Sequence, residues 1–88
     1  MMNKMYKELI KKLETKYFFY REPTDNEIYN FLGKLKTIKS HFGYISDNMV
    51  DECVEKYLPY ASLNLNEAEH MNYERLLIAE LSEIIDGL

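Results

Sequence analysis

The stretch Thr24–Phe42, TDNEIYNFLGKLKTIKSHF, carries the clearest folding signal in the chain. Thr24 and Glu27 have the spacing of a capping box, in which each side chain accepts a hydrogen bond from the other residue's main chain. Gly43 follows as a natural helix stop. We therefore predict an amphipathic helix over 24–42. Its apolar residues recur at helical spacing: Ile28, Phe31, Leu32, Leu35, Ile38 and Phe42.

Three further segments on either side of this helix have apolar residues at the same spacing. They predict helices over approximately 3–21, 46–58 and 65–86. Pro23 and Pro59 end the first and third of them, because proline lacks the amide hydrogen that a helix needs. Three Gly and two Pro are too few for a turn-rich β protein. We expect an all-α fold, a compact bundle of about four helices that forms a single small domain over 1–88.

Two details refine this prediction. Asn64 and Glu67 repeat the capping-box spacing of Thr24 and Glu27 at the start of the last helix. Gly33 lies inside the second helix, where glycine costs about 1 kcal/mol relative to alanine. We interpret its missing side chain as room for another helix to approach closely.

The two halves of the chain carry opposite charge. Residues 1–44 hold nine Lys or Arg against five Asp or Glu, a balance of +4, and residues 45–88 hold two against ten, a balance of −8. Such a pattern steers the choice of partner and says little about the fold. The acidic surplus exceeds what helix ends need, so it asks for a functional explanation. The alternative is that the basic and acidic surfaces neutralise each other within the bundle.

The sequence offers no catalytic constellation. There is no Gly-rich phosphate loop and no Ser/His/Asp arrangement in a motif context. Cys53 lies in an apolar stripe beside acidic residues that raise a thiol pKa, so we expect it to pack rather than react. We expect no enzyme activity and no cofactor. Without an apolar run of membrane length or a signal-peptide pattern, and with one cysteine, we expect a cytoplasmic protein that does not contact a membrane.

One alternative is a homo-oligomeric helical bundle, structural or metal-binding. Glu67, His70 and Glu74 lie at i, i+3 and i+7, and Glu-x-x-His on a helix is the arrangement of carboxylate-bridged di-iron bundles. The second Glu-x-x-His of such a site is missing, so only a homodimer would supply two copies. We therefore predict no metal site, and this set is the single candidate for one.

A second alternative is binding of nucleic acid through the basic first helix. Lys4, Lys7, Lys11 and Lys12 precede the aromatic run 17–20, and single-strand binders combine such groups. The net charge of −4 opposes a phosphate-binding role.

The preferred hypothesis is binding of a basic, nucleic-acid-handling protein, which this chain would inhibit or regulate. The chain has eight Tyr and no Trp, and tyrosine suits interfaces because it joins a large apolar body to a polar tip. Toxin-immunity proteins and phage-encoded inhibitors resemble this chain in size, helicity and acidity, and no motif assigns it to a named family. The predicted partner-binding residues are Asp47, Asp51, Glu52, Glu55, Tyr57, Tyr60, Glu67 and Glu74.

Overall fold

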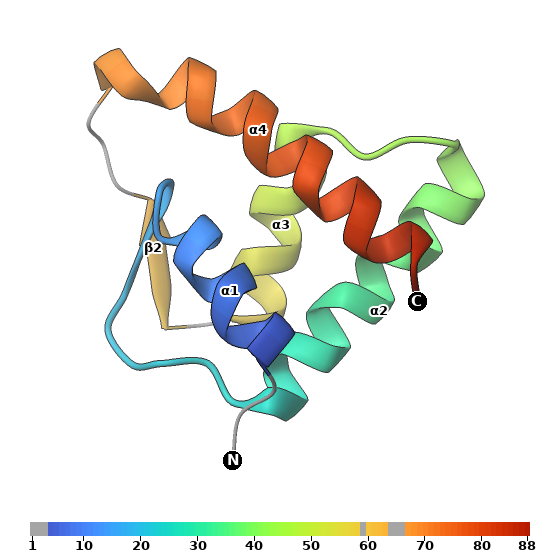
Figure 1. Ribbon diagram of the computed structural model, residues 1–88, viewed down its shortest axis with the longest axis horizontal. Coiled ribbons are helices and arrows are strands. Elements are labelled where there is room, and N and C mark those ends of the chain that lie inside the picture. Colours follow the sequence, from blue (N-terminus) through green and yellow to red (C-terminus); the bar gives the residue numbers. More distant parts are fainter. Residues whose placement is uncertain (1–3, 59, 64–66) are drawn as a thin grey trace.

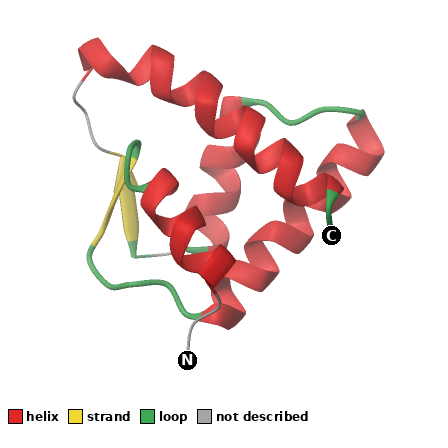
Figure 2. Ribbon diagram, in the orientation of Figure 1, coloured by secondary structure: helices red, strands yellow, loops and turns green. Residues whose placement is uncertain are grey.

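A computed structural model describes residues 4–58, 60–63 and 67–88, with the main chain alone at 63 and over 67–76. This part of the chain forms four helices and one small sheet, within 31 × 31 × 21 Å (Figures 1 and 2). Helix α4 lies across the others, and the two strands lie together at one side of the molecule (Figure 1). In chain order the elements are α1 (Lys4–Leu13), β1 (Tyr17–Phe19), α2 (Asp25–Phe42), α3 (Asp47–Tyr57), β2 (Ala61–Leu63) and α4 (Glu67–Asp86).

The predicted capping box of α2 is present. Thr24 Oγ1 accepts a hydrogen bond from the Glu27 amide at 3.2 Å, and Glu27 Oε1 accepts one from the Thr24 amide at 2.9 Å. At the other end Gly43 adopts a left-handed conformation, with φ of 84°, and its amide donates to the Lys39 carbonyl at 2.7 Å. Only glycine takes this conformation at little cost, so the predicted stop is also confirmed.

The predicted helix over 3–21 is wrong after Leu13. The chain turns at 14–16, and Tyr17–Phe19 becomes β1, which pairs antiparallel with β2. Aromatic residues favour strands, and a strand alternates its side chains between two faces. Tyr17 is therefore 3% exposed, while the next residue of the strand, Phe18, is 55% exposed. The described fold is mostly helical and compact with four helices, roughly as the predicted bundle requires, but its two-stranded sheet means that it is not purely α.

The third predicted helix is confirmed as α3, for which Ser46 is the N-cap, with its Oγ accepting from the Met49 amide at 3.4 Å. Helix α4 is confirmed from Glu67, whereas the proposed cap at Asn64 lies outside the described residues. None of the described helices has the length and apolarity needed to cross a membrane. Buried apolar side chains from every helix form one core: Leu9, Ile10, Leu13, Tyr17, Ile28, Phe31, Leu32, Leu35, Ile45, Val50, Cys53, Val54, Leu58, Leu77, Leu81 and Ile85.

Gly33 does not serve a close helix approach within the chain. It is exposed, and a Cβ built at this position would meet no described atom within 4 Å. That interpretation is therefore wrong for contacts inside the described part of the molecule, and the space beside Gly33 is open.

Candidate protein-binding surface

Ion pairs join the basic half of the chain to the acidic half. Lys12 Nζ lies 2.7 Å from a Glu80 carboxylate oxygen, and Lys39 Nζ lies 2.7 Å from Asp86 Oδ1. Part of the charge difference between the halves is therefore neutralised within the molecule, which is the alternative that the sequence left open. Acidic residues outside these pairs remain candidates for contact with a partner.

Asp51 belongs to an internal polar cluster that the sequence did not predict. Lys16 is 2% exposed, and its Nζ lies 2.9 Å from Asp51 Oδ1. The Tyr17 hydroxyl donates to the same carboxylate oxygen. Lys16, just before β1, and Tyr17, its first residue, are thereby tied to the middle of α3. A buried lysine needs such a partner, because an uncompensated charge is costly away from water.

The other predicted residues of α3 differ in their surroundings. Glu52 and Glu55 are exposed, and none of the ion pairs among the described residues includes them. Asp47 is half-buried and makes a further contact within the chain. Tyr57 is half-buried, with Lys56 Nζ 5.6 Å from its ring centroid. Among the carboxylates of α3, Glu52 and Glu55 are thus the solvent-facing ones available for a partner.

The remaining predicted residues fall into two groups. Tyr60 lies just before β2 and is 48% exposed. The side chains of Glu67, His70 and Glu74 lie outside the described residues, so the candidate metal set is untested. Within the described residues, no three His, Cys, Asp or Glu side chains lie close enough to hold a metal.

Exposed aromatic rings gather at the strand pair. Phe18 is 55% exposed, and its ring meets that of Tyr20 edge-on with centroids 5.0 Å apart. The guanidinium carbon of Arg21 lies 4.0 Å from the centroid of the Tyr60 ring. The main chain joins these groups, because the Tyr20 amide donates to the Tyr60 carbonyl at 2.9 Å. The rings are held in place by the ladder and by each other.

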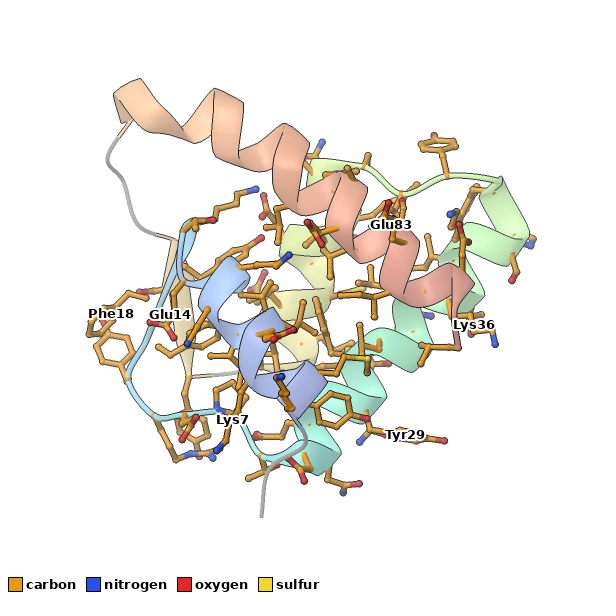
Figure 3. All side chains as sticks on the ribbon, in the orientation of Figure 1. Lys7, Glu14, Phe18, Tyr29, Lys36 and Glu83 are labelled. Atoms are coloured by element: carbon orange, nitrogen blue, oxygen red, sulfur yellow. The ribbon has the colours of Figure 1, made fainter. Side chains whose placement is uncertain are left out.

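A hollow of about 290 Å³ lies beside these rings, along β1 and the end of α1. Its carboxylates are Glu14 and Glu22, which are exposed and absent from the ion pairs of the described residues. Figure 3 shows Glu14 and Phe18 next to each other on this side. The apolar part of the lining comes from Ile10, Tyr17, Phe18 and Phe19. We name Glu14, Phe18, Tyr20, Glu22 and Tyr60 together the ribbon surface.

Sequence reasoning missed Glu14 and Glu22 because both belong to the half that carries net positive charge. A local signal was available: two glutamates bracket an aromatic run that reads equally well as a short strand.

A second polar network fixes the chain where it leaves the sheet. Two Glu27 carboxylate oxygens accept from Arg21 Nη2 at 3.1 and 3.0 Å. Burial acts to raise the pKa of Glu27, but hydrogen bonds from Thr24 and Arg21 outweigh it, so this pKa lies below its ordinary value of 4.5. The hydrogen bond to Glu27 likewise raises the pKa of Arg21. The network holds Arg21 beside Tyr60 and so supports the ribbon surface.

Cys53 is buried, as the sequence predicted. Burial raises the pKa of its thiol, which lowers the fraction of reactive thiolate. The residue therefore contributes packing to the core.

Comparison with known proteins gave no match: no family model, curated protein or solved structure is significantly similar to this chain. Its function therefore has to be argued from its own residues.

Proposed function

We propose that this protein binds another protein of basic surface through the ribbon surface. The observation that carries the proposal is the hollow in which Glu14 and Glu22 flank the exposed ring of Phe18. Arginine and lysine side chains are attracted both to carboxylates and to the faces of aromatic rings. The contact of Arg21 with Tyr60 is an example of this chemistry within the same surface.

The physical roles divide between the two kinds of side chain. The rings supply apolar area that can be buried at small entropic cost, because aromatic side chains have few rotatable bonds. The carboxylates and the net charge of −4 attract a basic partner and speed the encounter. Glu55 lies one helical turn after Asp51 on the same side of α3, so it extends the acidic surface next to β1.

Proteins that handle nucleic acids present basic surfaces, and a bound acidic protein occupies the place of the phosphates. We therefore propose inhibition or regulation of such a protein, in the manner of a toxin-immunity protein or a phage-encoded inhibitor. This extends the sequence-based hypothesis, and it moves the centre of the proposed contact from the predicted residues of α3, Tyr60 and α4 to the strand pair.

The test is affinity capture from a lysate of the source organism, quantified by mass spectrometry, with the wild-type chain and two charge-reversal variants. Glu14→Lys changes the hollow, whereas Glu83→Lys makes the same charge change on α4, on a different side of the molecule from Phe18 (Figure 3). Loss of one charge-assisted contact corresponds to about a tenfold loss of affinity. We expect recovery of a basic protein to fall by that factor for Glu14→Lys and to stay unchanged for Glu83→Lys. Equal recovery with both variants contradicts the proposal.

A second candidate function is binding of single-stranded nucleic acid through α1. Lys4, Lys7 and Lys11 are exposed and take no part in the ion pairs of the described residues, whereas Lys12 is paired with Glu80. Gel-shift titrations with single-stranded DNA test it. Binding through three lysines should weaken steeply with added salt, because each phosphate contact releases a counterion. Absence of a shift at low salt removes this candidate.

A further inference from the structure

A second surface lies away from the strand pair. A groove of about 600 Å³ runs beside α2, and its apolar lining includes Tyr6, Tyr29, Leu32, Tyr57 and Leu88. Figure 3 places Tyr29 and Lys36, which both line it, on the opposite side of the molecule from Phe18. This groove is therefore independent of the ribbon surface and of the function proposed for it.

Three residues of α2 form a line along the groove. Tyr29, Gly33 and Thr37 follow each other at intervals of four, which places them one above the other on a helix. They span about 12 Å along the axis, or slightly more than two turns. A large ring and a branched side chain therefore flank a central position that has no side chain.

Gly33 is not required by the fold. Of the described glycines only Gly43 has a positive φ, so the main chain at Gly33 does not need glycine. No described atom lies within 4 Å of a Cβ placed there, so packing among the described residues does not need it either. Glycine in a helix lowers stability relative to alanine. The open space beside Gly33 would let another main chain approach α2 closely at this position.

The charged side chains among the described lining residues of the groove are of one sign. Lys34 and Lys36 line it, and no Asp or Glu is among its described lining residues. Lys34 is exposed, and the described ion pairs do not include it. Lys36 Nζ donates to the main-chain oxygen of Leu88 at 2.7 Å, so its ammonium is held at the groove edge. An occupant that complements these charges carries carboxylates beside its apolar face.

We propose that this groove binds an amphipathic helix of a partner protein, with acidic residues flanking its apolar face and a close approach over Gly33. Helices dock in grooves through apolar residues spaced three and four apart, and two turns of such a helix match the length of the line from Tyr29 to Thr37. The tyrosines supply the contact area, and Lys34 and Lys36 select acidic flanks.

The experiment uses a displayed library of helical peptides with a fixed apolar face and randomised flanking positions, selected on the wild-type protein. We expect Asp and Glu to be enriched at the flanks. Gly33→Leu fills the open space at Gly33, and Lys34→Glu reverses a charge that lines the groove. Each variant should lower the affinity for the selected peptides by about tenfold or more. Gly33→Ala leaves most of the space and should weaken binding less than threefold.

Matched controls separate the groove from other surfaces. Ser40→Leu adds the same side chain on an exposed position of α2 outside the groove, and Lys11→Glu reverses an exposed lysine of α1. Both should bind the peptides like the wild type. Circular dichroism verifies that Gly33→Leu stays helical, as the open space at this position predicts.

Four outcomes overturn the proposal. The first two are failure to select any peptide and enrichment of neutral or basic residues at the flanks. The third is an affinity for the peptides that Gly33→Leu leaves unchanged. The fourth is self-association of the protein that Gly33→Leu abolishes, because the occupant of the groove is then a second copy of this chain. Peptides lost on Glu14→Lys but not on Gly33→Leu occupy the ribbon surface, and they also count against the groove. Failure at the groove leaves the function proposed for the ribbon surface to its own test.

Discussion

Replacing Asp51 by alanine should destabilise the protein more than the loss of any exposed carboxylate. The change leaves the Lys16 ammonium, which is 2% exposed, without the carboxylate 2.9 Å away, and it removes the acceptor of the Tyr17 hydroxyl. Both groups belong to the segment that places β1 against α3.

The expected loss of stability on Asp51→Ala follows from how deeply the ion pair is buried. Removing one partner of a fully buried ion pair costs about 3–5 kcal/mol. The Asp51 side chain is 33% exposed, and Lys16 and Tyr17 make further contacts, so we discount this to about 2 kcal/mol. A chain of this length has a total stability of about 4–13 kcal/mol. The expected fall in Tm is about 8–16 °C.

The assay is thermal and urea unfolding followed by circular dichroism, with Glu55→Ala as the matched control on the same helix. Glu55 is exposed and outside the described ion pairs, so its loss should change stability by less than about 0.5 kcal/mol. The double variant Lys16→Met/Asp51→Leu removes the charges together and should recover most of the lost stability. Equal Tm values for Asp51→Ala and Glu55→Ala, or no recovery in the double variant, refute the reasoning.

Three further outcomes test the local chemistry. Gly33→Ala should raise stability by about 1 kcal/mol in urea unfolding, because no described atom is within 4 Å of the added methyl group. The pKa of Glu27 is lower in the folded state, so ionised Glu27 stabilises the fold above pH 4.5, its ordinary pKa, and this stabilisation is lost as the pH falls further. Glu27→Gln should therefore flatten the acid side of a profile of stability against pH. The raised pKa of buried Cys53 should make alkylation by iodoacetamide about tenfold slower in the native protein than in urea.

Local signals accounted for the helices that the sequence predicted well. Thr24, Glu27 and Gly43 fix the limits of α2 through hydrogen bonds that stay within three or four residues. Such contacts join residues that are close in the sequence, so they can be recognised without knowing the rest of the fold.

The error over 17–20 has a different origin. Periodicity cannot distinguish a helix from a strand in so short an uninterrupted aromatic run, and the choice is decided by β2, which lies about forty residues later. Lys16 and Asp51 likewise meet from distant positions. The charge balance of residues 1–44 does not single out Glu14 and Glu22, because that half carries net positive charge. Their neighbours in space are the aromatic rings of β1, and this placement depends on the distant pairing with β2.

The short ladder between β1 and β2 also closes a long loop in the middle of the chain. Its three residue pairs enclose 20–60, which contains α2 and α3 whole. Closing a flexible loop of this length costs about 3 kcal/mol in chain entropy, more than so few ladder hydrogen bonds supply alone. We therefore expect the ladder to form after α2 and α3 have packed and shortened the loop. During synthesis β1 therefore has no strand to pair with until residues 61–63 have been made.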